Sequence, residues 1–155
     1  MDALETLVAE RDCARLTYRY CRFADGGEAS RLAELFTEDG VFQTPEMLLR
    51  GRAQIAATFT EREALTDLQT LHLCTNIDIE VLGPTTARGW VNLCLFRRWR
   101  EVGSTAPVDV TAPSLVASYE DAYAQVDGRW LLSSRVQRVV FTDPSDTGWA
   151  RPQDR

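Results

Sequence analysis

The sequence predicts an α+β protein in which N-terminal helices pack against one face of a strongly curved, mainly antiparallel sheet. Helical spacing of apolar residues is confined to the first 62 residues, whereas the chain after residue 68 consists mostly of long extended segments. Two of these segments flank "DGR" at residues 127–129, the strongest hairpin signal in the chain. Long twisted strands wrapped around a helix form a cone-shaped fold, and its apolar interior is a natural ligand pocket.

The first predicted element is a long amphipathic helix from Ala3 to Ala24. This segment lacks Gly and Pro, and its apolar residues recur near helical spacing: Leu4, Leu7, Val8, Cys13, Leu16, Tyr20 and Phe23. "DGG" at residues 25–27 ends the helix, because glycine is favoured just past a helix C-terminus. The next segments are predicted, in order, as a short helix, a turn, a short strand, a loop and a third helix: 29–36, 37–40, 41–44, 45–51 and 53–62.

The second half is predicted as two pairs of long strands. Leu68–Leu82 and Thr86–Arg100 are joined by "GPT", and Ser114–Val126 and Trp130–Thr142 are joined around "DGR". A linker at residues 102–113 separates the two pairs. We expect residues 1–142 to form a single domain and residues 143–155 to form a polar C-terminal tail.

Composition excludes several classes of function. A net charge of −6 argues against a nucleic-acid surface, which depends on cationic contacts to phosphate. The acidic N-terminus has no apolar core of a secretory signal, and no apolar run is long enough to span a bilayer, so the cytoplasm is the expected location. The four cysteines lie in apolar segments and are expected to be free thiols. No nucleotide-binding or histidine-rich metal motif is present.

His72 is the only histidine and lies in the predicted strand "TLHLCTNIDIEV". Alternation along a strand places His72, Cys74 and Asn76 on one face. Asp25 ends the first helix, where a carboxylate is mildly disfavoured by the helix dipole. Asp25 either opens an Asp-Gly turn, or it points inward and orients the imidazole as a general base or acid. Spacing alone favours neither interpretation.

Four further side chains are candidates for substrate binding. Tyr20 would stabilise an oxyanion, Asn76 would bind a carbonyl, and Trp90 would line the wall. Arg135 lies in a strand with apolar neighbours, so it needs a partner such as Asp25 or a substrate anion. Core packing for Tyr20, a backbone contact for Asn76 and a surface position for Arg135 are the alternatives.

The opposite face of the histidine strand is also apolar. Leu71, Leu73, Ile77 and Ile79 would need cover if the His72 face lines the cone. A second subunit would supply that cover, so we expect a homo-oligomer, either a dimer or a trimer.

Four segments together span nearly the whole chain: "YRYCRFADGGEASRLAELFTEDGVF", "LRGRAQIAATF", "LHLCTNIDIEV" and "YEDAYAQVDGRWLLSSRVQ". Through these segments the chain resembles the SnoaL-like branch of the nuclear transport factor 2-like superfamily, and within it the scytalone dehydratase and lindane dehydrochlorinase group. This resemblance implies the cone-shaped fold, no cofactor, and Asp25 and His72 as a catalytic dyad. Arg135 matches a dehydrochlorinase active-site arginine, whereas Tyr20 stands where that enzyme has lysine.

Two functions follow as hypotheses. The first is a cofactor-independent lyase or isomerase, of the dehydratase or cyclase type, that abstracts a proton from a small apolar and cyclic substrate. The second is a non-catalytic module of the same fold that binds a small ligand or dimerises, since fold alone does not determine function.

Overall fold

The computed structural model describes residues 1–152 and contains three helices and one six-stranded sheet. The helical elements are α1 (Ala3–Asp25), the 3₁₀ helix η1 (Ala29–Leu35) and α2 (Arg52–Glu63). The strands are β1 (Phe36–Gln43), β2 (Leu48–Arg50), β3 (Leu68–Gly83), β4 (Thr86–Trp99), β5 (Leu115–Val126) and β6 (Arg129–Thr142). Their order is β2-β1-β6-β5-β4-β3, and only the β1–β6 pairing is parallel. The predicted α+β class is confirmed.

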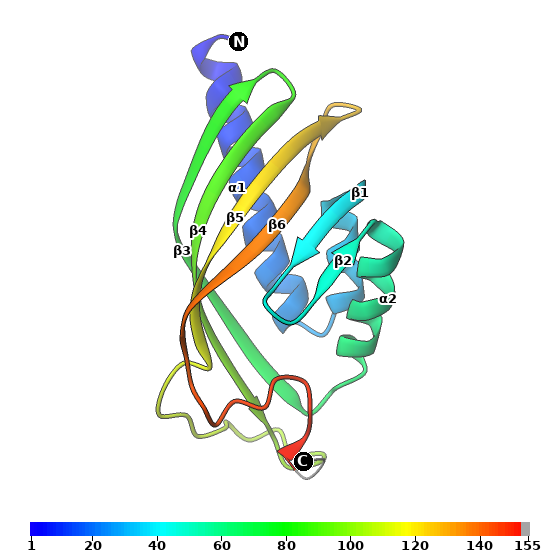
Figure 1. Cartoon of the computed structure of the whole chain (residues 1–155), viewed down its shortest axis with the longest axis vertical. Helices are drawn as coiled ribbons and strands as arrows, with labels where there is room; N and C mark the ends of the chain where they lie inside the picture. Colours follow the sequence, from blue (N-terminus) through cyan, green and yellow to red (C-terminus); the bar gives the residue numbers. More distant parts are fainter. Residues whose placement is uncertain (153–155) are drawn as a thin grey trace.

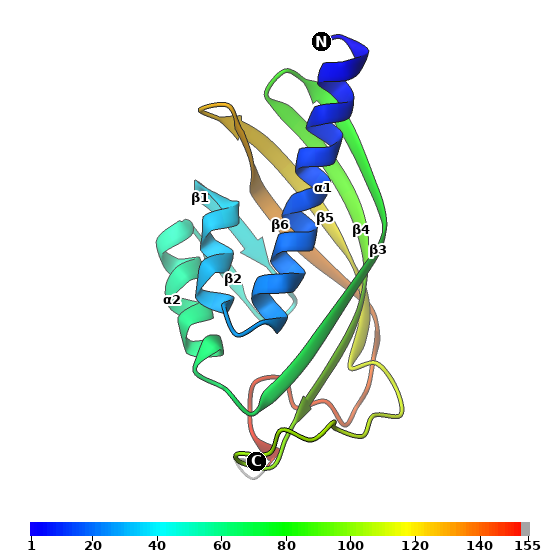
Figure 2. The ribbon, with the colours of Figure 1, turned by 180° about the vertical axis from the view of Figure 1, so that it is seen from behind.

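The long strands β3–β6 curve along the molecule, and α1 lies across their concave face (Figures 1 and 2). A capping box between Asp2 and Glu5 begins α1, and Gly26 follows its last residue. The face of α1 that meets the sheet is buried and comprises Ala9, Cys13, Leu16, Thr17, Tyr20 and Phe23. Helix α2 and strands β1 and β2 close the cone on the other side of α1.

The first third differs in detail from the sequence expectation. The predicted helix at 29–36 is a 3₁₀ helix, and the predicted turn at 37–40 lies inside β1, which is irregular between Phe36 and Val41. The predicted loop at 45–51 contains the three-residue strand β2. None of these short segments has enough apolar periodicity to distinguish the alternatives. Pairing of β1 with β6 and of β2 with β1 makes the last two segments strands.

A bulge in β3 changes which residues face the cone. The pairing of β3 with β4 shifts between Thr75 and Asp78, and Asn76 has a positive φ of 50°. Before the bulge, Thr70, His72 and Cys74 face inward. After it, Ile77, Ile79 and Val81 pack against the core. The expectation of uninterrupted alternation along this strand was wrong for residues 76–81.

The C-terminal segment returns across the wide end of the cone (Figure 1). Three ion pairs hold its described part: Arg98–Asp143, Arg97–Asp146 and Arg151–Asp67, with closest N–O distances of 2.5, 2.5 and 2.6 Å. Trp149 also contacts the Phe59 ring edge-on, with centroids 5.9 Å apart. The predicted polar tail is therefore packed against the domain as far as the structure describes it. Among residues 1–152, no helix is long and apolar enough to cross a membrane.

Candidate active site

A cavity of about 90 Å³ lies inside the cone, between α1, α2 and the sheet. Its walls are mostly apolar and aromatic, and its polar lining residues include His72, Thr70, Tyr20, Tyr119, Gln137 and Arg62. It is smaller than the roughly 150 Å³ engineered apolar cavity that holds benzene. The enclosed space therefore accepts one small ring only if its walls yield slightly.

Asp25 and His72 meet at the edge of this cavity. The distance between His72 Nδ1 and Asp25 Oδ1 is 2.6 Å, and the His72 backbone N–H donates to Asp25 Oδ2 at 2.7 Å. The Thr70 hydroxyl donates to Asp25 Oδ1 at 2.9 Å. Side-chain exposure is only 12% for His72 and 17% for Asp25. With Nδ1–H donated to the carboxylate, Nε2 is the unprotonated nitrogen and is free to act as a base.

The position of Asp25 at the C-terminus of α1 is electrostatically unfavourable, and its hydrogen bonds offset that cost. Burial raises the pKa of Asp25, but hydrogen bonds with His72 and Thr70 and the charge of His72 more than reverse this effect. The pKa of Asp25 consequently lies below its ordinary value. The carboxylate is thus kept ionised, and it accepts the Nδ1–H of the imidazole.

Two tyrosines line the cavity, Tyr20 from α1 and Tyr119 from β5. Tyr20 and Tyr119 are buried, with ring centroids 5.9 Å apart, and the Tyr20 ring lies 6.0 Å from the His72 ring. Burial raises the pKa of both hydroxyls, so both remain neutral hydrogen-bond donors. Tyr119 was not identified from the sequence, although alternation with the buried Asp121 and Ala117 in β5 was an available signal.

Arg135 does not line the cavity. It is fully buried, and it forms a bidentate pair with Asp121, with Nε–Oδ1 and Nη2–Oδ2 distances of 2.8 and 2.6 Å. Its guanidinium carbon lies 4.6 Å from the Tyr20 ring centroid and 4.3 Å from the Tyr119 ring centroid. The prediction that Arg135 pairs with Asp25 or with a substrate anion was wrong, because its partner is Asp121. Arg135 instead supports the two tyrosines from behind.

The prediction that Asn76 and Trp90 contact the substrate was also wrong. The bulge turns the exposed Asn76 out of the cone, and Trp90 lies on the outer face of β4 beneath the Arg88 guanidinium. Trp90 pairs with Asp78, beyond the bulge, and its side chain is 41% exposed. The inward residues of β4 are its neighbours Gly89 and Val91. Neither Asn76 nor Trp90 can contact a ligand in the cavity.

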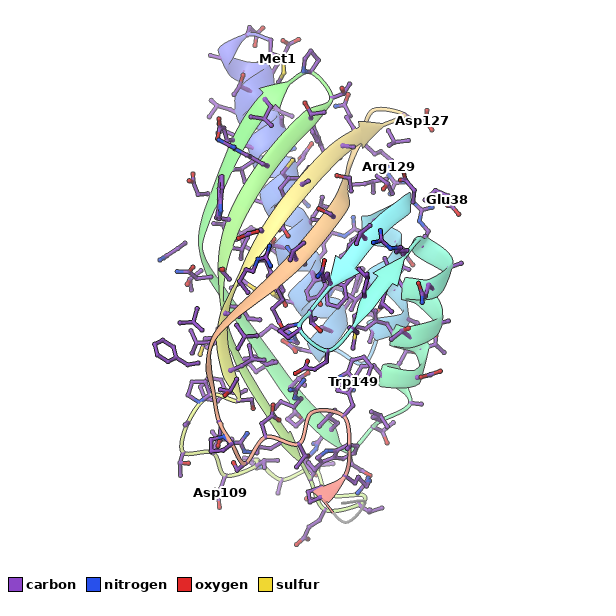
Figure 3. All side chains as sticks on the ribbon, in the orientation of Figure 1. Met1, Glu38, Asp109, Asp127, Arg129 and Trp149 are labelled. Carbon is purple, nitrogen blue, oxygen red and sulfur yellow. The ribbon has the colours of Figure 1, made fainter. Side chains whose placement is uncertain are left out.

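Trp149 separates this cavity from a larger, more open one of about 640 Å³. Five residues line both spaces: Glu46, Met47, Arg97, Leu115 and Trp149. In Figure 3 the Trp149 side chain points from the C-terminal segment toward helix α2 and strand β2. The two spaces therefore adjoin beneath the C-terminal segment.

Within residues 1–152, no three His, Cys, Asp or Glu side chains gather as a metal site would require. The four cysteines are free. Burial raises the pKa of Cys13 to about 12, with smaller contributions from the charges of Asp12 and Asp121, so this thiol remains protonated.

Fold and site together define a cone-shaped α+β protein with an imidazole–carboxylate pair in its interior cavity. Residues 5–136 match the model of the SnoaL-like domain, and the chain belongs to this family. No curated protein sequence matches the chain. The expected nuclear transport factor 2-like fold is confirmed by solved structures.

Three of these solved structures are informative. A putative scytalone dehydratase from Novosphingobium aromaticivorans has 25% sequence identity and a TM-score of 0.77, with 99% of each chain covered. LinA has 18% identity and a TM-score of 0.76, with 98% of this chain and 100% of that chain covered. A protein from Catenulispora acidiphila in complex with S-DNPA has 21% identity and a TM-score of 0.68, with coverage of 86% and 94%. At these identities the last two show the fold alone.

Proposed function

We propose that the protein is a cofactor-independent lyase or isomerase of the dehydratase or cyclase type, acting in the cytoplasm on a small, mostly apolar cyclic molecule. The observation that carries this proposal is the contact of His72 Nδ1 with Asp25, which leaves Nε2 free beside an enclosed cavity. The likeness to a putative scytalone dehydratase and to LinA supports a lyase as the class of enzyme.

In the proposed reaction, His72 Nε2 removes a proton from a carbon next to a carbonyl group. The electron pair of that C–H bond forms a C=C bond, and the π pair of the carbonyl group moves onto its oxygen. Asp25 stabilises the resulting imidazolium. Tyr20 and Tyr119 are the neutral donors available to the enolate oxygen. When the enolate re-forms the carbonyl, a leaving hydroxyl on the neighbouring carbon takes the proton from His72 and departs as water. Return of the proton to a different carbon gives isomerisation instead.

The tyrosine at position 20 favours a dehydratase or cyclase over a haloalkane-eliminating enzyme. The resembling dehydrochlorinase has a lysine at this position, and a cation suits a departing chloride better than a neutral hydroxyl does. A neutral donor suits an enolate oxygen whose negative charge is transient.

Association of two or three copies through the outer face of the sheet is a second part of the proposal. One row of paired residues crosses four strands: Leu73, Cys94, Val116 and Phe141. Leu73 is 44% exposed and Phe141 is 67% exposed. An apolar row of this kind, on a sheet whose other face is already covered, is typical of a surface buried by another subunit. A non-catalytic module that binds a ligand or dimerises would use the same features, and the next experiment separates it from an enzyme.

The test uses 3-hydroxycyclohexanone and cyclohex-3-enone. Elimination of water from the first and isomerisation of the second both give cyclohex-2-enone, which is followed by its ultraviolet absorbance. The wild-type protein should accelerate at least one reaction, and His72→Ala and Asp25→Asn should lose most of that rate. Asp127→Asn, in the β5–β6 turn, is the matched control and should keep that rate.

Exchange of the substrate α-protons with deuterated water, followed by NMR, detects proton abstraction that does not go on to product. Exchange that is equal with and without His72 would rule the mechanism out.

A further inference from the structure

Arg62 places a positive charge in the cavity that the proposed mechanism does not use. It lies one residue before the end of α2, and its side chain lines the same space as His72. Its guanidinium donates to the carbonyl oxygens of Leu65 and Leu68 at 3.4 and 3.1 Å, and to Thr70 Oγ1 at 3.3 Å. All three acceptors are neutral.

No carboxylate within the described part of the chain lies within 4 Å of Arg62, whereas most other arginines of the cone's wide end have one. The charge of Asp25 raises the pKa of Arg62, and the Thr70 hydroxyl contacts both groups. Both oxygens of Asp25 already accept hydrogen bonds from His72 or Thr70. Burial lowers the pKa of Arg62, and the charge of Arg97 lowers it further.

The donors of Arg62 are only partly used. Three hydrogen bonds occupy three of the five N–H groups of a guanidinium, so two remain without an acceptor in residues 1–152. A partly buried cation with neutral acceptors and spare donors attracts an anionic oxygen. The other cavity arginine, Arg97, lacks this property because Asp146 pairs with it through two hydrogen bonds.

We propose that Arg62 binds a carboxylate of the substrate, so that the molecule held in this cavity is a small ring compound carrying one carboxylate. This inference rests on the proposed function only in placing the reacting carbon at His72; the binding itself does not require catalysis. The apolar part of the ring would lie against Phe42 and Phe59, which line the cavity near α2. We assign a permanent anion, the carboxylate, to Arg62, because Tyr20 and Tyr119 already provide neutral donors for the transient negative charge of the enolate oxygen. The protein carries a net charge of −6, so attraction of an anion has to come from such a local site.

The competing role for Arg62 is to position Asp25 through Thr70. That role predicts that loss of Arg62 changes the Asp25–His72 contact and turnover, without altering the preference for anions. A comparison of benzoate with benzamide separates the two roles, because these compounds have nearly the same shape and differ in charge.

The experiment measures the affinity of the full chain for benzoate and for benzamide by calorimetry at pH 7. We expect the wild type to prefer benzoate by about 10- to 100-fold, as for a hydrogen bond to a charged group. Arg62→Gln should abolish this preference, and Arg62→Lys should retain part of it. Arg50→Gln removes the same charge from an exposed position on β2 and should change nothing.

A second measurement needs no substitution. The Nε–H NMR resonance of Arg62 in the wild type should shift on addition of benzoate and not on addition of benzamide. This result holds even if Arg62→Gln fails to fold through loss of its bonds to Leu65 and Leu68.

Equal affinity of the wild type for the two compounds would overturn the proposal, and so would a preference for benzoate that survives in Arg62→Gln. Anion binding by the wild type without turnover would contradict the proposed enzyme and leave the role of Arg62 standing. Turnover without a preference for the anion would support the proposed enzyme and contradict the role of Arg62.

Discussion

The carboxylate of Asp25 accepts hydrogen bonds from both the backbone amide of His72, at 2.7 Å, and Thr70, at 2.9 Å, while it contacts the His72 ring at 2.6 Å. One side chain at the end of α1 is thereby fixed against the first residues of β3. The same contacts set the orientation of the imidazole and join two segments that are 47 residues apart in the chain. The catalytic proposal and the stability of this corner therefore depend on the same carboxylate.

Replacement of Asp25 by asparagine should separate orientation from charge. The amide keeps the size of the side chain but no longer stabilises an imidazolium, and it permits the wrong histidine tautomer. We expect turnover to fall by about 10²- to 10⁴-fold, the scale of general acid–base catalysis. Rate measurements on the two cyclohexanone compounds check this, with Asp127→Asn as the control. A loss below about threefold would contradict the role of Asp25.

The low pKa of Asp25 predicts how stability depends on pH. A carboxylate whose pKa is lowered by folding stabilises the folded state at pH values above its unfolded pKa of about 3.9. This contribution is lost as the pH falls through the lower, folded value. Urea unfolding of wild type and Asp25→Asn between pH 7 and pH 2.5 should therefore give a difference in the free energy of unfolding that shrinks toward the acid end. A difference that stays constant over this range would show that the carboxylate charge contributes nothing.

The buried pair of Arg135 and Asp121 offers a direct comparison with a surface pair. Asp121→Asn leaves a fully buried guanidinium without its counter-charge and should lower the free energy of unfolding by about 3–5 kcal/mol. Arg138 and Glu120 lie on the same two strands but are about half exposed, so Glu120→Gln should cost about 0–1 kcal/mol. Chemical denaturation of both variants measures the difference. Equal losses would mean that burial of the pair has no energetic consequence.

Trp149 should control access to the cavity. Trp149→Ala removes the contact with Phe59 and joins the small inner space to the larger outer one. We expect benzoate to dissociate faster from this variant, by at least several-fold, while the wild-type fold is retained. Stopped-flow displacement provides the dissociation rate. Trp90→Ala, on the outer face, is the control and should leave it unchanged.

The apolar row on the outer sheet face should determine the oligomeric state. Leu73→Glu places a charge at the β3 end of this row and should convert an oligomer into monomers, as measured by sedimentation. Val126→Glu, at the β5–β6 turn and away from the row, is the control. A monomeric wild type at micromolar concentration would contradict self-association through this face.

Much of this protein follows from local sequence patterns. The helical spacing in residues 3–24, the Gly residues after Asp25 and the turn at residues 127–129 each depend on neighbours within a few positions, and the structure contains all three features. The resemblance also led to the contact between Asp25 and His72, because an acid at a helix end and a histidine at a strand start are recognisable in sequence.

Other features depended on pairings between distant segments. A single extra residue at Asn76 changes which residues of β3 face the core after the bulge. No side-chain pattern in that apolar strand predicts the bulge. Arg135 pairs with Asp121 because the two residues lie opposite one another in the β5–β6 register. Trp149 lines the cavity because three ion pairs hold the C-terminal segment against the domain. The sequence determined the long helix and the long strands, since these rest on local energies, and the family resemblance indicated the imidazole with its acid. Only the tertiary structure decided which side chains face the cavity, since burial and strand register are properties of the whole sheet.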